Sequence, residues 1–243
     1  MNLKYTIPIF HNHLSYLLIH FLHQISPLKV WIYRSGFARF SNTRYSLDAI
    51  SDSYIHLTNV AIQKTAPDYD PEKGCKWSIQ QLRQYLNAKH GLKVVSDIFC
   101  QIDCTIIKSL QSVQKIIIND KHCFETFGYD ILLDDQLKVW LIEINACPSL
   151  TASGKEDYDL KFGMLTDVLN VLDLENRLTG KEKRVGGFDL LWDDGPVFAD
   201  EGNMLINGNS PTIMNSFLGC KNGRKIHLRQ MYQSLAASQK KES

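Results

Sequence analysis

The sequence predicts an α/β (α+β) fold in which a mixed or antiparallel sheet is flanked by helices. Short runs rich in strand-forming residues are separated by polar turns, and two longer segments carry apolar residues at helical spacing. With 243 residues, 44% of them hydrophobic, the chain can bury a substantial core. The formal net charge of +1 gives no overall field that would favour nucleic acid or an acidic surface.

Each expected element follows from a local pattern. Strands are expected in "VWIYRSGFARF", with a break at Gly36, in "DSYIHLTNVAIQK", and in "FGYDILLDD" and "VWLIEIN" on either side of a polar turn. A helix should begin after Ser78 and stop at Gly91, because serine caps helix starts and glycine ends helices. A final helix is expected over 160–172. One long core helix is predicted from apolar residues three and four apart: Val95, Ile98, Ile102, Ile106, Leu110, Val113 and Ile117.

Three parts of the chain differ in character. Residues 1–29 are expected to be a divergent leader, too short for a membrane span and without a small-residue cleavage site. Residues 30–180 are expected to form the main domain. Residues 181–243 are rich in Gly, Asn and Asp and end in a basic stretch, so we expect a loop-rich extension with a basic tail. That tail fits either a helix for an acidic partner or a solvated terminal helix.

Six scattered cysteines with no pairing pattern predict a reduced, intracellular protein with buried thiols. Metal ligands are the less favoured interpretation of these cysteines.

Glu143 and Asn145 lie within "VWLIEIN", which otherwise reads as a buried strand. A buried ionised carboxylate costs roughly several kcal/mol unless something compensates it. In a regular strand, Leu141, Glu143 and Asn145 share one face. Asp130 in the preceding strand projects to that face if the connecting loop has an even number of residues, and to the other face if the number is odd.

With an even loop, two carboxylates and an amide oxygen meet on one surface. Such an oxygen-only set suits Mg²⁺, which prefers one or two carboxylates together with phosphate oxygens. The alternative is a pair of exposed acids on an edge strand.

The stretches "KHCFETFGYDILLDDQLKVWLIEINACPSLT", "YIHLTNVAIQK" and "YRSGFARFS" together resemble the tubulin-tyrosine-ligase-like family of ATP-grasp enzymes, and within it the polyglutamylase branch. The resemblance covers roughly residues 30–220. It implies a partial ATP-grasp-type domain with the N-terminal half missing, because residues 1–29 match nothing in that half. Family members use ATP to make an acyl-phosphate and join glutamate to glutamate side chains of tubulin tails.

The resemblance also implies a role for individual residues of the nucleotide site. Asp130 and Asn145 would each hold one Mg²⁺, and Glu143 would bridge the two ions. The residues that would contact ATP are His56, Leu57, Thr58, Asn59 and Ile142. Since the family's N-terminal half supplies lysines over the phosphates, the chain alone is expected not to catalyse.

Two cations complete the implied site. Arg39, which together with Glu143 would act in catalysis, would bind the α-carboxylate of the incoming glutamate through its planar fork. Lys76 would hold the second carboxylate of that glutamate. No nucleophilic Ser or Cys is needed, because the acceptor carboxylate attacks phosphorus and the amine then attacks the acyl-phosphate.

The implied partners are tubulin or microtubules with acidic tails, free L-glutamate and ciliary partner proteins, with no nucleic acid and no membrane. The implied location is the cytoplasm and cytoskeleton, including the cilium, basal body or flagellum. Two functions stay open: an ATP- and Mg²⁺-dependent glutamate ligase, or a non-catalytic subunit of a microtubule or ciliary complex that keeps the fold.

Overall fold

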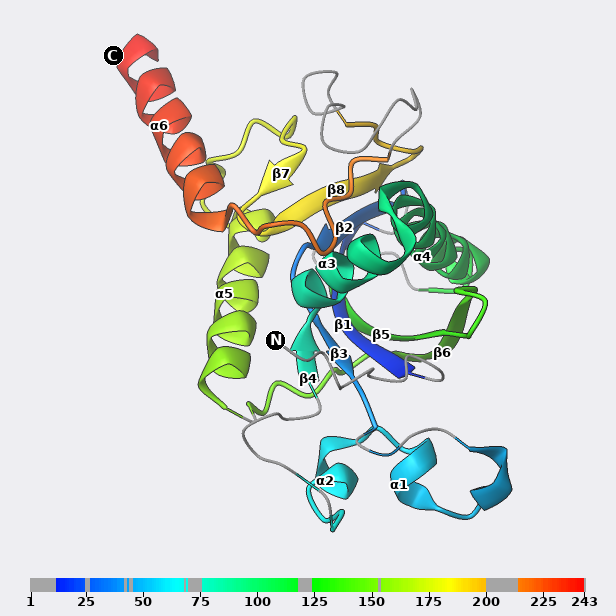
Figure 1. Ribbon diagram of the computed structural model, residues 1–243. Coiled ribbons are helices and arrows are strands. Elements are labelled where there is room, and N and C mark those ends of the chain that lie inside the picture. The colour runs from blue at the N-terminus through cyan, green and yellow to red at the C-terminus, as the bar shows by residue number, and fades with distance from the viewer. Residues whose placement is uncertain are drawn as a thin grey trace.

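An antiparallel six-stranded sheet lies between helical layers (Figure 1). The computed structural model describes residues 12–24, 27–41, 43, 46–67, 69, 76–117, 124–152, 154–199 and 214–242, without the side chains of residues 12–24, 47, 60 and 234–242. In spatial order the strands are β6 (Val139–Asn145), β5 (Glu125–Leu133), β1 (Asn12–Gln24), β2 (Lys29–Tyr33), β8 (Phe188–Asp193) and β7 (Arg184–Val185). A separate two-stranded sheet pairs β3 (Phe37–Arg39) with β4 (Lys76–Ser78).

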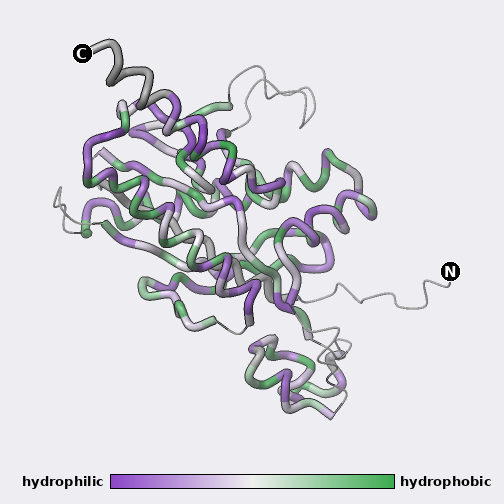
Figure 2. Tube along the Cα trace, turned by 90° about the vertical axis from the view of Figure 1, so that its left-hand side faces the viewer, coloured by the Kyte–Doolittle hydropathy of each residue, from purple (hydrophilic) through white to green (hydrophobic). Residues whose placement is uncertain are grey.

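The helices fall into two covering layers and one small peripheral pair. The main helices are α3 (Ile79–His90), α4 (Leu92–Val113), α5 (Lys155–Leu172) and α6 (Arg224–Glu242). The short elements are the 3₁₀ turn η1 (Leu47–Ala49), α1 (Ser53–His56) and α2 (Val60–Gln63). Along α3, α4 and α5, hydrophilic and hydrophobic residues alternate (Figure 2), as expected when one side of each helix packs against the rest of the domain. Within the described residues, no helix combines the length and apolar character needed to cross a membrane.

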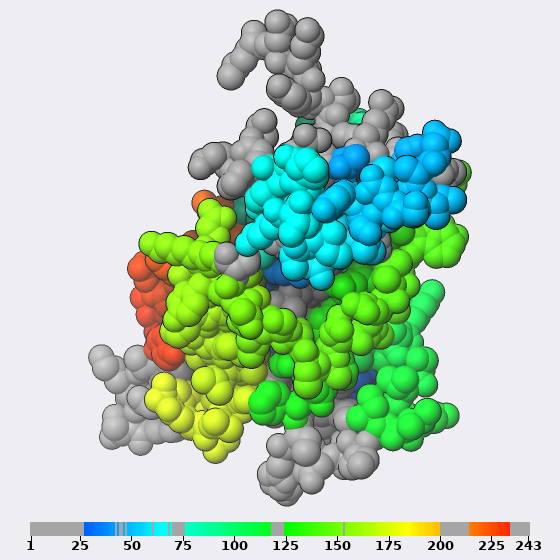
Figure 3. Space-filling view, turned by 90° about the horizontal axis from the view of Figure 1, so that it is seen from below, coloured from blue at the N-terminus to red at the C-terminus, as the bar shows by residue number. Residues whose placement is uncertain are grey.

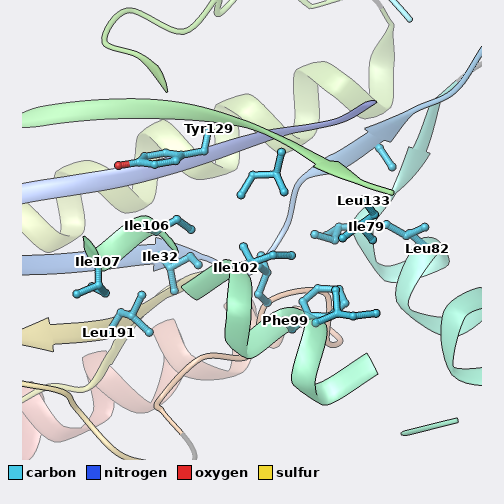
Figure 4. Packing of buried hydrophobic residues seen from close by; sticks show 14 of the residues in the cluster. Ile32, Ile79, Leu82, Phe99, Ile102, Ile106, Ile107, Tyr129, Leu133 and Leu191 are labelled. Carbon is cyan, nitrogen blue, oxygen red and sulfur yellow. The ribbon is translucent and has the colours of Figure 1, made fainter. Parts of the chain in front are cut away.

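The core lies on both faces of the sheet, because side chains alternate along each strand. Val30 and Ile32 of β2 face α3 and α4, and the close-up in Figure 4 shows Ile32 among Ile102, Ile106 and Leu191. Trp31 and Tyr33 of the same strand pack on the other face, against α5. On that face the packed residues are Met164, Val168, Val171, Val185, Phe188 and Leu190. The expected sheet with flanking helices is therefore confirmed.

Several sequence-based boundaries are confirmed. Ser78 caps α3 in a capping box with Gln81, and the helix ends at Gly91, whose φ of +84° favours glycine. The apolar spacing correctly predicts α4, which ends at Val113 and so excludes Ile117. The last expected helix exists as α5 but begins at Lys155, before the predicted residue 160.

The strand expected in "DSYIHLTNVAIQK" is wrong, because this segment forms α1 and α2. Asp52 accepts a hydrogen bond from the Tyr54 amide (2.9 Å), and Asn59 Oδ1 accepts one from the Ala61 amide (3.0 Å). Side-chain oxygens that accept from backbone amides two residues ahead start helical turns. These local caps override the strand-like composition.

Two segments expected outside the sheet belong to it. The stretch "GGFDLLWDD" was expected to be loop, but β8 pairs with β2 and buries Phe188 and Leu191 completely. At the other end, β1 lies between β2 and β5, inside the range expected to be a leader. The three domain boundaries themselves stay a prediction. The expectation of buried thiols is wrong for Cys100 and Cys147, which are exposed.

Candidate functional site

Asp130 of β5 lies directly opposite Glu143 of β6. The strands pair Leu133 with Val139, so the loop between them consists of residues 134–138, an odd number that by itself would put the two carboxylates on opposite faces. Ile131 pairs with Leu141 and Asp130 pairs with Glu143, so the register shifts between these two pairs. Ile142 is thereby left as an extra residue on β6. This β-bulge restores the common face.

The same bulge changes which side chains of β6 share a face. Directly opposite residues of an antiparallel pair project to the same side. Leu141 therefore shares a face with buried Ile131, and Glu143 shares the other face with Asp130. The expected grouping of Leu141 with Glu143 is wrong, because it assumed an unbroken alternation.

Glu143 interacts with both neighbours that the sequence placed beside it. Asn145 Nδ2 donates to Glu143 Oε1 at 3.1 Å. This hydrogen bond, and then the one with Asp130, hold the pKa of the Glu143 carboxyl below its usual range. The expectation of a buried strand is wrong: β6 is an exposed edge strand, so water solvates Glu143 and the dry-interior penalty does not arise.

The donor set on this edge fits a magnesium ion. It offers two carboxylates and one amide oxygen, hard ligands of the type that Mg²⁺ prefers, on an exposed edge strand. No cluster of three or more His, Cys, Asp or Glu that could hold a metal occurs within the described residues. Asp130, Glu143 and Asn145 are a smaller set completed by an amide, so they suit a metal that is shared with a phosphate ligand.

The residues expected to contact ATP lie in the α1–α2 segment, with the exception of Ile142. His56 Nε2 is 3.0 Å from the Ala49 carbonyl oxygen, Thr58 is buried, and Leu57 and Asn59 are exposed. Hydrogen bonds of His56, Leu57 and Asn59 connect parts of this segment to one another. Figure 3 shows the blue and cyan atoms of this segment on the same face of the molecule as green atoms of the segment that includes β5 and β6.

Arg39 and Lys76 are brought together by the small sheet. They are direct partners in the β3–β4 pair, so their side chains share a face. Both stand over the Phe37 ring: Arg39 Cζ is 5.2 Å and Lys76 Nζ is 3.5 Å from its centroid. The structure thus confirms that these two cations are neighbours, and it leaves their roles as predictions.

Two residues that sequence reasoning missed complete this cluster. Asp157 Oδ1 is 2.9 Å from Lys76 Nζ, and Asp157 Oδ2 is 3.3 Å from Lys161 Nζ. Both belong to α5, and Lys161 also donates to the Thr151 carbonyl (2.5 Å) in the segment that follows β6. The signal available in the sequence was an acid and a lysine four apart, which share a helix face. It was lost because the helix was expected to begin only at residue 160.

An antiparallel sheet between helical layers is consistent with an α/β domain of the ATP-grasp-like type. The chain belongs to the tubulin-tyrosine ligase family, which matches residues 17–180.

Curated relatives agree with this membership. A protein named "Probable tubulin polyglutamylase TTLL9" from Rattus norvegicus is 60% identical over 217 residues, which cover 89% of this chain and 47% of that protein. Its namesake from Bos taurus is 59% identical over 88% of this chain and 46% of its own length. "Probable alpha-tubulin polyglutamylase Ttll1" from Tetrahymena thermophila is 46% identical over 69% of this chain and 43% of its own length. The chain spans about half the length of the first two relatives.

Proposed function

We propose that the chain is part of a tubulin polyglutamylase, an ATP- and Mg²⁺-dependent ligase that adds glutamate to glutamate side chains of tubulin tails. The observation that carries the proposal is the direct opposition of Asp130 and Glu143, next to Asn145, in a chain 60% identical to a protein named as such an enzyme. The non-catalytic alternative is not favoured, because the names of the relatives specify polyglutamylases.

The metal part of the proposal rests on the edge strand. Asp130 and Asn145 would each hold one Mg²⁺, with Glu143 between the two ions. The bound metal would neutralise the phosphates of ATP, the usual contribution of magnesium to phosphoryl transfer. The nucleotide itself would contact His56 to Asn59 and Ile142, the residue that bulges beside the metal ligands.

The amino-acid part rests on the cation cluster. The Arg39 guanidinium would bind the α-carboxylate of free L-glutamate, and Lys76 would bind the side-chain carboxylate. Arg39 and Lys76 share a face over Phe37, so one cation could bind each carboxylate of the same amino acid. Two such cations would select an amino acid that has two carboxylates. The acidic tails of tubulin would supply the acceptor carboxylate, and the proposed place of action is the cytoskeleton, including cilium, basal body and flagellum.

Magnesium-dependent ATP binding tests the site directly. Mg²⁺ should raise the affinity of the chain for ATP by about tenfold or more, and Glu143→Gln should remove that gain, since a charge-assisted contact contributes about 1.5–3 kcal/mol. Asp135→Asn is the matched control, because Asp135 is an exposed acid of the same hairpin. Equal Mg²⁺ dependence in the unchanged chain and Glu143→Gln would refute the metal assignment.

Transfer of radiolabelled glutamate to purified tubulin tests the reaction. We expect label on tubulin with Mg-ATP and none with Glu143→Gln, in a form extended to the length of the relatives. An extended form that binds Mg-ATP but never labels tubulin would refute the proposed substrate.

A further inference from the structure

The carboxylate of Asp157 lies between two ammonium groups. One oxygen contacts Lys76 of β4 and the other contacts Lys161 of its own helix, at 2.9 and 3.3 Å. Both α5 residues are buried, and the Lys76 side chain is 24% exposed. Asp157 therefore fixes where two lysine side chains from different elements meet.

The cluster contains more positive than negative charge. Arg39 is the third cation, and its Nε is buried without a hydrogen-bond partner within the described part of the chain. With all four groups charged, Asp157 contacts the two lysines and Arg39 lies beside Lys76, so among the described residues the cluster of three cations and one carboxylate carries two net positive charges. Partly buried charge of this kind is stabilised by an anion. The chemistry that matches the excess is a ligand with two carboxylates.

We infer that Asp157 is a positioning residue for a dicarboxylic amino acid: it holds Lys76 and Lys161 beside Arg39 so that their free donors face the ligand. This inference rests on the proposed function, whose substrate is L-glutamate. It adds a residue that never touches the substrate and acts through the lysines that would.

The protonation of Lys76 gives this role a physical basis. Burial, and then the nearby Lys161 and Arg39 charges, lower the pKa of Lys76, while the hydrogen bond and charge of Asp157 oppose that shift. Asp157 thus favours the charged form of Lys76 before any ligand arrives. Without Asp157 that stabilisation is lost, so glutamate binding should become more sensitive to a rise in pH.

The experiment is a titration of the full chain with L-glutamate and, separately, L-glutamine, by calorimetry at pH 7 and pH 9. We expect Asp157→Asn to weaken glutamate binding about tenfold at pH 7, to weaken it further at pH 9, and to reduce the preference over glutamine. Glu156→Gln is the control, because Glu156 is an exposed acid in the same first turn of α5. This substitution removes the same favourable charge at the helix start.

Each result decides a separate question. No glutamate binding by the unchanged chain would refute the glutamate site itself, together with its positioning residue. Glutamate binding that keeps its affinity and pH dependence in Asp157→Asn, with only a lower melting temperature, would show that Asp157 is a structural ion-pair partner and overturn this inference alone. If Asp157→Asn does not fold, Asp157→Glu is the second variant, since it keeps the charge but displaces both lysines by one methylene. It should weaken glutamate binding about threefold or more at a similar melting temperature. Unchanged binding would overturn the inference.

Discussion

Arg34, just after β2, forms a two-point ion pair with Asp189 of β8, with neither side chain more than 2% exposed. Arg34 Nε is 2.8 Å and its terminal nitrogen 2.6 Å from the two carboxylate oxygens. Burial raises the pKa of Asp189, and the Arg34 charge opposes that rise. The pair joins two neighbouring strands, and Asp189 lies on the sheet face that packs against α3 and α4, because it is directly opposite Ile32.

Breaking this pair should be costly. Asp189→Asn leaves the Arg34 guanidinium buried without a counter-charge, so we expect the free energy of unfolding to fall by about 3–5 kcal/mol. Asp193→Asn is the control, since Asp193 lies in the same strand but pairs with Lys29 at the surface, where such pairs contribute about 0–1 kcal/mol. Urea denaturation measures both, and similar losses would contradict the assignment.

Asp103 of α4 predicts a pH dependence of stability. It is almost fully buried, accepts a hydrogen bond from Ser216 at 3.2 Å, and burial raises its pKa from 3.8 to about 7. Below pH 4 the carboxyl is protonated in both states. Between about pH 4 and 7 the unfolded chain releases this proton while the folded chain keeps it, so the Asp103 contribution to stability falls as pH rises.

Asp103→Asn should remove this effect while keeping an acceptor for Ser216. Relative to the unchanged chain, the variant should gain up to about 4 kcal/mol of unfolding free energy between pH 4 and pH 7, and no more above that range. Denaturation curves at several pH values test the prediction, and a constant difference between the two proteins would contradict it.

The bulge at Ile142 should not be needed to keep Glu143 opposite Asp130. Deleting Ile142 should give a regular register in which Glu143 directly follows Leu141 and still lies opposite Asp130, so Mg²⁺ should still strengthen ATP binding. The melting temperature should change little, because β6 is an exposed edge strand. Ile142→Ala keeps the bulge and should also keep the Mg²⁺ dependence. Loss of Mg²⁺ dependence on deletion, but not in Ile142→Ala, would contradict this and show that the bulge itself positions the side chains of Asp130 and Glu143.

Arg39 and Lys76 should differ in their effect on glutamate binding. Arg39→Ala removes a planar fork and should weaken glutamate binding by about one to two orders of magnitude, more than Lys76→Ala, and Arg39→Lys should not restore it. Lys64→Ala, which removes an exposed cation of the neighbouring segment, is the control. Calorimetric titration measures all four, and a larger effect on ATP affinity than on glutamate affinity would refute the division of roles.

The position of β1 predicts that the segment around it is essential for folding. Deleting residues 12–24 removes the strand between β2 and β5 and leaves backbone groups of both neighbours unpaired. We expect the melting temperature to fall by roughly 10 °C or more, or cooperative unfolding to disappear. An unchanged thermal transition would show that β5 and β2 hold together without β1.

The sequence by itself determined those features whose causes are local. Ser78 and Gly91 bound α3 because capping is a contact within one turn, and the apolar spacing predicted α4 because one face of a helix must be buried. Asp130, Glu143 and Asn145 could be grouped because they lie on two adjacent strands of one hairpin, although the sequence left open whether they share a face. The helical turns around "HLTN" also have local causes, because the caps of Asp52 and Asn59 override the strand-like composition of this segment.

Only the tertiary structure decided the features that depend on distant partners. The bulge at Ile142 is fixed by pairing with β5, and a hairpin loop of odd length gave no sign of it. β8 and β1 are strands because the sheet supplies hydrogen-bond partners on either side, although their sequences read as loop and leader. Asp157 meets Lys76 only because α5 packs beside the small sheet, and a contact between residues so far apart in the chain leaves no periodic trace in the sequence.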